Sequence, residues 1–189
     1  MENTNRQYDA VLAACRKIFD SKTSDYGTSW RVLRTISIAD QIFIKAKRIR
    51  TIQENKSQQV ADNIASEFAG ILNYAIIGNI LLTLPAAAEN ELPAAKALSL
   101  YDEQAAAAKK LMQQKNHDYG EAWRDMSQES FTDLILTKLL RIKQILKNEG
   151  KTIISEGIEA NYFDIINYAV FALIAIAETE ETNPAREKI

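Results

Sequence analysis

The chain contains a long internal repeat, which limits the architectures open to it. The segment Lys22-Thr-Ser-Asp-Tyr-Gly-Thr-Ser-Trp-Arg31 returns later as Lys115-Asn-His-Asp-Tyr-Gly-Glu-Ala-Trp-Arg124. The same shift aligns further residues: Tyr8 with Tyr101, Asp9 with Asp102, Lys45 with Lys138, Arg48 with Arg141 and Asn55 with Asn148. With one residue added to the shift, Asn73-Tyr74-Ala75 aligns with Asn167-Tyr168-Ala169. We therefore expect two copies of one structural unit.

Both copies have a composition that favours helices. The 189 residues include only 6 glycines and 3 prolines, and a hydrophobic content of 47% is enough for a substantial core. Apolar periodicity predicts six helices, at residues 7–20, 37–54, 57–84, 99–115, 130–148 and 152–180. Within the first motif, Asp25-Tyr-Gly27 predicts a turn, because glycine readily adopts a backbone geometry that other residues disfavour.

The division into domains follows from the repeat. Two of the prolines, Pro85 and Pro93, separate the two repeat frames. We expect a first repeat at residues 1–84, a linker at 85–97 and a second repeat at 98–189, packed together as one globular unit. The predicted fold is an all-α six-helix bundle, in which two three-helix repeats face each other across a pseudo-twofold axis as an intramolecular pseudo-dimer. The sequence leaves further pairing into a homodimer open.

Charge and cysteine content narrow the range of partners and the compartment. A formal net charge of −2 argues against duplex nucleic acid as a partner but leaves a small phosphorylated molecule open. Cys15 is the only cysteine, which suits a reducing cytosol, so we expect a cytoplasmic protein. The most apolar runs, at residues 71–84 and 165–177, are shorter than the ~20 residues of a membrane span. We expect buried helices there and no membrane association.

Acidic residues with helical spacing occur near the start of the last predicted helix. Glu156, Glu159, Asp164 and Asn167 fall on one face of that helix. A hard cation such as Mg²⁺ binds carboxylate oxygens, so Glu156, Glu159 and Asp164 are candidate metal ligands. Alternatively, the two glutamates are solvated acids that the helix dipole favours at a helix start. Asp164 lies in an apolar stretch, where a carboxylate requires a partner or a function.

Each copy also carries a basic pair on its second predicted helix. Lys138 and Arg141 are three residues apart and share a face, and Lys45 and Arg48 repeat them in the first copy. Such a pair suits phosphate oxygens. Such a pair is equally suited to ion pairs with Asp164 and Glu156 across the helix interface. The sequence leaves both interpretations open.

The repeated motif itself has two interpretations. Tyr119 and Trp123 can stack on a nucleobase, with Lys115 and Asp118 as charges at the rim of the site. Asn167 would complete this nucleotide-binding set. In the other interpretation, Trp123 is a core anchor and Asp118 accepts hydrogen bonds from backbone amides around a tight turn.

These residues together suggest a family. The pattern Lys-x-x-Asp-Tyr-Gly-x-x-Trp, the following Lys-x-x-Arg-Ile helix and the stretch Asp164-Ile-Ile-Asn167-Tyr168-Ala169 resemble the nucleotide modification associated domain 1 family, in two copies over nearly the whole chain. More distantly, the plan is similar to the all-α nucleotide pyrophosphohydrolases of the MazG and dimeric dUTPase type. In those enzymes, acidic residues on two successive helices hold Mg²⁺ while water attacks a nucleoside triphosphate and releases pyrophosphate.

The chain departs from that enzyme pattern in both copies. Lys138 and Arg141 stand where MazG-type enzymes have a Glu-x-x-Glu pair, so half of the expected metal cage is missing. The first copy departs further at aligned positions: Asp62 aligns with Glu156, Ser66 with Ala160 and Gly70 with Asp164. Glu67 lies about one turn away and is a candidate substitute for the missing acid. We expect the first copy to be degenerate as a metal site.

Two hypotheses follow. In the first, the protein is a nucleotide-binding, Mg²⁺-dependent pyrophosphohydrolase, in which Glu156 and Asp164 bind the metal and Lys138 and Arg141 bind phosphate. In the second, it is a catalytically silent helical module that binds a nucleotide or a protein partner, and its charged faces form only structural ion pairs.

Overall fold

The computed structural model describes residues 2–59, 63–85, 91–154 and 156–182, and these residues contain helices but no strand. The helices are α1 (Glu2–Tyr26), η1 (Ser29–Val32), α2 (Thr35–Asn55), α3 (Ile64–Thr83), α4 (Ala94–Tyr119), η2 (Ala122–Asp125), α5 (Gln128–Lys147) and α6 (Ile158–Thr182), where η denotes a 3-10 helix. The order in α1 to α3 repeats in α4 to α6. The predicted all-α fold of two three-helix repeats is confirmed.

The first helix of each copy is longer than predicted. No glycine or proline interrupts α1 or α4 before Gly27 and Gly120, so the motif residues from Lys22 to Tyr26 belong to the last turns of α1. Gly27 and Gly120 have φ angles of 66° and 64°, a region that favours glycine, and each helix ends there. The predicted turn at Gly27 is therefore confirmed, but the motif before it is helical.

The third helix of each copy starts later than predicted. α3 begins at Ile64, because the Asn63 side chain accepts a hydrogen bond from the Ser66 backbone N–H at 2.8 Å and caps the helix. α6 begins at Ile158, so Glu156 precedes it. The expected linker at 85–97 includes the start of α4 at Ala94, and its middle part lies outside the described residues, as does Asp62.

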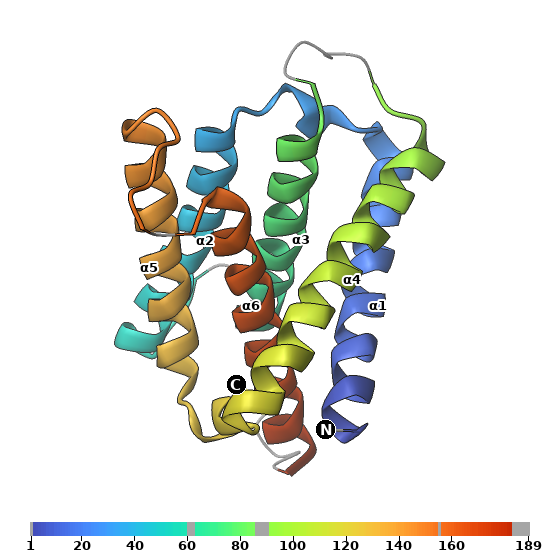
Figure 1. The fold of residues 1–189 in the computed structure, drawn as a ribbon. Coiled ribbons are helices and arrows are strands. Elements are labelled where there is room, and N and C mark those ends of the chain that lie inside the picture. Colours follow the sequence, from blue (N-terminus) through green and yellow to red (C-terminus); the bar gives the residue numbers. More distant parts are fainter. Residues whose placement is uncertain (1, 60–62, 86–90, 155, 183–189) are drawn as a thin grey trace.

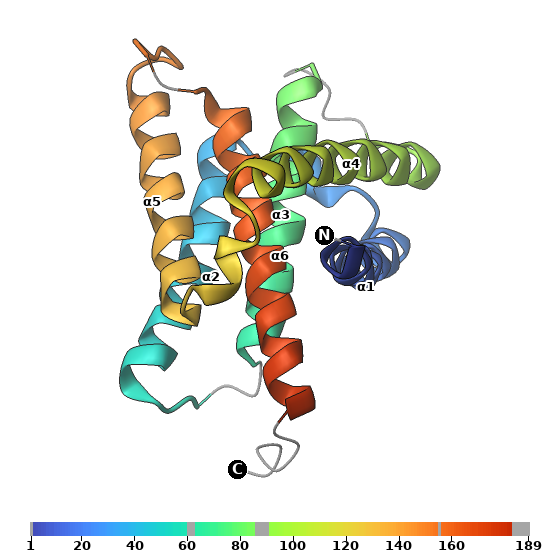
Figure 2. The same cartoon turned by 60° about the horizontal axis from the view of Figure 1, so that its bottom comes forward.

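The helices are arranged as three pairs of repeat equivalents. α3 and α6 lie at the centre, α2 and α5 on one flank, and α1 and α4 on the other (Figure 1; Figure 2). The most extensive packing joins α3 to α6, which are equivalents, and α2 also packs on its own equivalent, α5. This arrangement is that of two like subunits around a twofold axis.

Reciprocal hydrogen bonds confirm the pseudo-twofold relation. The Tyr8 hydroxyl donates to Asn167 Oδ1 at 2.7 Å, and the equivalent Tyr101 hydroxyl donates to Asn73 Oδ1 at 2.8 Å. All four side chains are buried. The first helix of each copy therefore holds a residue in the third helix of the other copy, as expected for an isologous interface.

Two sets of ion pairs follow the same symmetry. On the α1–α4 flank, Arg16 pairs with Asp102 at 2.6 Å and Lys109 pairs with Asp9 at 2.5 Å. On the α2–α5 flank, Arg50 pairs with Asp133 at 3.6 Å and Lys143 pairs with Asp40 at 2.6 Å. In each set, the second pair is the repeat equivalent of the first. The predicted intramolecular pseudo-dimer is thus present in the contacts of both flanks.

The central helices are apolar because they form the core. By length and composition alone, Ile64–Thr83 and Ile158–Glu181 are long and apolar enough to cross a membrane, and 61% of each apolar window is buried in the bundle. The expectation that these runs are too short for a span was wrong, because the apolar character continues over 20 and 24 residues. Burial at the centre of the bundle accounts for that character.

Candidate functional site

In the second copy, the Asp164 carboxylate is held between two lysines. Asp164 on α6 is only 4% exposed, and its Oδ1 accepts a hydrogen bond from Lys115 Nζ at 2.6 Å. Its Oδ2 lies 2.5 Å from Lys138 Nζ. Burial alone would lower the pKa of Lys115, but the hydrogen bond and the charge of Asp164 outweigh burial and raise that pKa above its ordinary value. Both carboxylate oxygens are therefore occupied by ammonium groups.

The other two predicted metal ligands do not join Asp164. Glu156 is exposed and precedes α6, and Glu159 is exposed in its first turn. Within the part of the chain that the structure describes, no group of three His, Cys, Asp or Glu residues is placed to hold a metal ion. Glu156, Glu159 and Asp164 thus do not form the metal-binding face that their spacing predicted. Because Asp164 is neutralised by lysines, these residues do not fit a magnesium ion.

In the first copy, the acid lies one helical turn earlier. Glu67 on α3 is 7% exposed, and its two oxygens accept from Lys45 Nζ at 3.0 Å and from Arg48 Nη1 at 2.6 Å. Gly70 stands at the position of Asp164. Each copy thus carries one buried acid against the same set of bases, and the shift of that acid by one turn changes which bases it binds.

A different base is left over in each copy. Lys22, the equivalent of Lys115, has no ion pair or hydrogen bond with any described residue and is exposed. In the second copy, Arg141 on α5 is the base without an ion pair or hydrogen bond among the described residues. The ion-pair interpretation of the basic pairs therefore holds for Lys45, Arg48 and Lys138. It does not hold for Arg141, which pairs with no acid among the described residues.

A cavity of about 540 Å³ opens beside Gly70 in the first copy. It is lined by residues of α1, η1, α2 and α3. These include the motif residues Lys22, Tyr26, Gly27 and Trp30, the repeated residues Lys45, Asn73 and Tyr74, and Glu67. We call this space the first-copy cavity. The motif that recurs in both copies thus surrounds a cavity in the first.

The size of three side chains explains the difference between the copies. Ala69, Gly70 and Ile77 line the first-copy cavity. The second copy has larger side chains at the aligned positions: Phe163, Asp164 and Phe171. The two phenylalanine rings and the carboxylate have a larger volume than alanine, isoleucine and glycine, so they leave less space at these positions of the second copy.

The aromatic residues of the second motif do not form a stacking platform. Trp123 is 7% exposed and lies parallel to Phe171, with ring centroids 4.3 Å apart and planes 5° apart. It is a core side chain, so the packing interpretation fits it. Tyr119 is 75% exposed on the surface. Asp118 is also exposed, and its carboxylate contacts the neighbouring His117 ring at 3.0 Å, whereas described backbone amides make no hydrogen bond to it.

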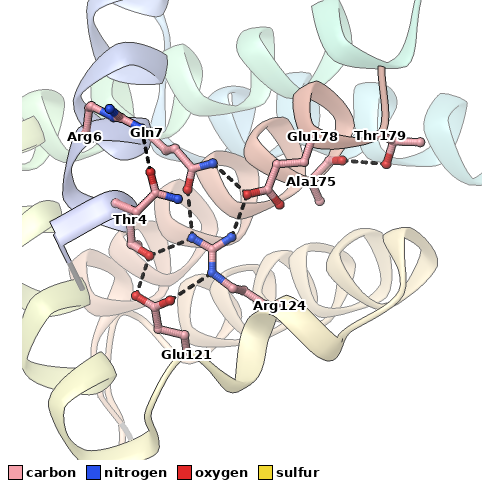
Figure 3. Close-up of polar contacts among 9 residues, drawn as sticks. Thr4, Arg6, Gln7, Glu121, Arg124, Ala175, Glu178 and Thr179 are labelled. Carbon is pink, nitrogen blue, oxygen red and sulfur yellow. Dashed lines mark hydrogen bonds and ion pairs between the residues drawn. The ribbon is translucent and has the colours of Figure 1, made fainter. Parts of the chain in front are cut away.

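Arg124, the last residue of the second motif, connects this motif to α1 and α6 through side-chain hydrogen bonds (Figure 3). Its guanidinium donates to four side chains: Glu121 at 2.9 Å, and Glu178, Thr4 and Gln7 at 2.8 Å. It also lies over the Trp123 ring, 4.4 Å from the ring centroid. Sequence reasoning gave Arg124 no role, because its partners on α1 and α6 are distant in the chain and only docking brings them together.

We predict that Glu121 makes the stability of the protein depend on acid pH. The hydrogen bond from Thr4, together with Arg124, lowers the pKa of Glu121 from 4.5 to about 2. A lowered folded-state pKa stabilises the fold above the unfolded pKa, and this contribution is lost as the pH falls through the folded pKa. Glu121→Gln is therefore expected to be less stable than wild type at neutral pH, with the difference shrinking from about pH 5 to about pH 2.

Urea denaturation midpoints measured over that pH range check this prediction. The exposed Glu159 provides the control, because Glu159→Gln removes a solvated carboxylate and should track wild type. A Glu121→Gln deficit that stays constant with pH would contradict the assignment.

The remaining predicted residues lie away from the first-copy cavity. Arg141 and Glu156, together with the buried Asn161, which was not predicted, line an open hollow of about 680 Å³ between α5 and the start of α6. Asn167 is 4% exposed and bonds to Tyr8, so it belongs to the interface between the copies. Neither place contains a residue of the repeated motif segment.

Comparison with known proteins adds one finding. The family model described as nucleotide modification associated domain 1 matches the chain twice, at residues 22–82 and 115–176. Each match begins at the motif lysine of its copy and continues into α3 or α6. No curated protein and no solved structure gave a match.

Proposed function

We propose that this chain, which belongs to the nucleotide modification associated domain 1 family in both of its halves, is a nucleotide-binding module. Its ligand occupies the first-copy cavity. One observation carries the proposal. The repeated motif lines a cavity in the first copy, where Lys22 lacks a carboxylate partner among the described residues. In the second copy, the corresponding Lys115 is paired with Asp164.

The chemistry of the lining supports a ligand with an aromatic part and an anionic part. Tyr26 and Tyr74 provide aromatic surface, on which a nucleobase can stack. Lys22 and Lys45 provide ammonium groups that suit phosphate oxygens. The cavity volume of about 540 Å³ falls in the range of ~300–1,000 Å³ that is usual for small-molecule sites.

The same lining supports binding better than hydrolysis. A pyrophosphohydrolase of the MazG type uses several carboxylates around Mg²⁺, and such ions take carboxylate oxygens in preference to other ligands. Glu67 is the one carboxylate among the described residues that line this cavity, and Lys45 and Arg48 hold both of its oxygens. In this proposal, Mg²⁺ enters only as the counter-ion of a nucleoside di- or triphosphate.

Calorimetric titration with nucleosides, nucleoside monophosphates and nucleoside triphosphates, with and without Mg²⁺, tests the proposal. We expect binding by wild type, and Lys22→Met should weaken it on the order of tenfold or more, because a hydrogen bond to a charged group contributes about 1.5–3 kcal/mol. Lys17→Met is the matched control, since Lys17 is exposed on the same helix and does not line the cavity.

Two results would count against this function. If no nucleotide releases heat or raises the melting temperature of wild type, the cavity does not bind nucleotides. If Lys22→Met binds as tightly as Lys17→Met, the ligand lies elsewhere. Pyrophosphate release from a triphosphate with Mg²⁺ would favour the hydrolase hypothesis instead.

A further inference from the structure

The second copy contains a carboxylate at the place where the first copy leaves space. Asp164 lies between Lys115 and Lys138, at 2.6 Å and 2.5 Å from their ammonium nitrogens. Each of these three residues has an equivalent in the first copy: Gly70, Lys22 and Lys45. The two lysines are therefore retained in the first copy, and only the carboxylate is missing.

One retained lysine, Lys45, lies at the position of the missing carboxylate, and the other, Lys22, lines the same cavity. A Cβ atom added to Gly70 would lie 3.2 Å from Lys45 Nζ and 2.9 Å from Lys45 Cε, so the ammonium group of Lys45 lies directly over this glycine. Lys22 and Gly70 both line the first-copy cavity. An anion placed over Gly70 therefore meets Lys45 at once and lies within the cavity that Lys22 also lines.

The local charge indicates what kind of anion fits. Lys22 and Lys45 both line the cavity, and Lys45 shares the Glu67 carboxylate with Arg48. The Glu91 carboxylate lies against Gly27, at another part of the lining. A phosphate monoester carries about −1.5 to −2 at neutral pH and three acceptor oxygens, so it can bridge both lysines.

We infer that the first-copy cavity recognises a terminal phosphate monoester, which lies over Gly70 between Lys22 and Lys45 in the position that the Asp164 carboxylate takes in the second copy. This inference rests on the proposed function and narrows it to nucleoside monophosphates. By the same reasoning, the Asp164 carboxylate takes the place of the ligand's phosphate in the second copy, so among the described residues only the first copy offers such a site.

Substitutions at Gly70 test this position. Gly70→Asp supplies the missing carboxylate from the protein itself, and we expect it to weaken the binding of a nucleoside 5′-monophosphate on the order of tenfold or more. Gly70→Asn has nearly the same shape without the charge. The melting temperature of the ligand-free protein should be higher for Gly70→Asp than for Gly70→Asn, because only the carboxylate pairs with the lysines.

Gly70→Asn is also the control for the binding measurement, because it adds nearly the same bulk over Gly70 without the charge. We therefore expect Gly70→Asp to bind the monophosphate more weakly than Gly70→Asn does. Titrations with the matching nucleoside, ribose 5-phosphate and inorganic phosphate separate the base from the phosphate. We expect the nucleoside to bind on the order of tenfold more weakly than its monophosphate, and ribose 5-phosphate and inorganic phosphate to bind more weakly as well.

Each contrary outcome has a distinct meaning. If wild type binds the nucleoside as tightly as the monophosphate, or if Gly70→Asp binds the monophosphate as tightly as Gly70→Asn does, the phosphate does not lie over Gly70, and the proposed function survives. If ribose 5-phosphate binds as tightly as the nucleotide, the monoester position stands and the base is not recognised. If wild type binds none of these molecules, the proposed function fails and this inference fails with it.

Discussion

Replacing Asp164 by leucine is expected to lower the free energy of unfolding by about 3–5 kcal/mol, the range measured when one partner of a buried ion pair is removed. The Lys138 side chain is only 12% exposed, so its ammonium group would remain buried without its counter-charge. Lys115 is 46% exposed and can turn its ammonium group into water. Most of the loss therefore comes from Lys138, and urea denaturation followed by circular dichroism measures it.

A second variant separates the lost charge from lost packing. Asp164→Asn combined with Lys138→Met removes both charges and keeps similar volumes, so it should recover much of the stability lost in Asp164→Leu. If the double variant is as unstable as Asp164→Leu, the unpaired ammonium group of Lys138 is not the cause of the lost stability. A loss below about 1 kcal/mol in Asp164→Leu would show that the pair behaves like a surface ion pair.

Gly78→Leu is expected to destabilise the protein by about 3 kcal/mol, at the upper end of what overpacking usually costs. A Cβ atom at Gly78 would lie 2.8 Å from two atoms of the Tyr162 ring, and Tyr162 is fully buried. Gly78 is on α3 and Tyr162 is on α6, so the contact lies in the main interface between the copies. A longer side chain must push these central helices apart.

Gly157→Ala is the matched control, because an added Cβ there meets nothing within 4 Å. It should leave the unfolding free energy within about 0.5 kcal/mol of wild type. Chemical denaturation compares the two variants directly. If Gly78→Leu unfolds at nearly the same denaturant concentration as Gly157→Ala, the close approach of α3 and α6 does not limit side-chain size at this crossing.

The fold class could be predicted because its signals are local or periodic in the chain. Apolar periodicity located all six helices, and the aligned motifs showed that α4 to α6 repeat α1 to α3. The starts of α3 and α6 were misplaced because a helix start depends on a cap such as Asn63 rather than on periodicity. That error also placed Glu156 on a helical face to which it does not belong.

Contacts between the copies could be anticipated only in part. The sequence showed that Tyr8, Tyr101, Asn73 and Asn167 recur, which marked them as members of a common plan. It did not show that each tyrosine binds the asparagine of the other copy, because that exchange depends on how the copies dock.

The candidate site shows most clearly where sequence reasoning ends. From the sequence alone came the two copies, the helical class, the motif and the expectation that Asp164 needs a partner. Only the tertiary structure decided that two lysines provide this partner and that a cavity opens beside Gly70. Helical periodicity is a property of one segment, whereas a cavity depends on the volumes of side chains that several helices bring together.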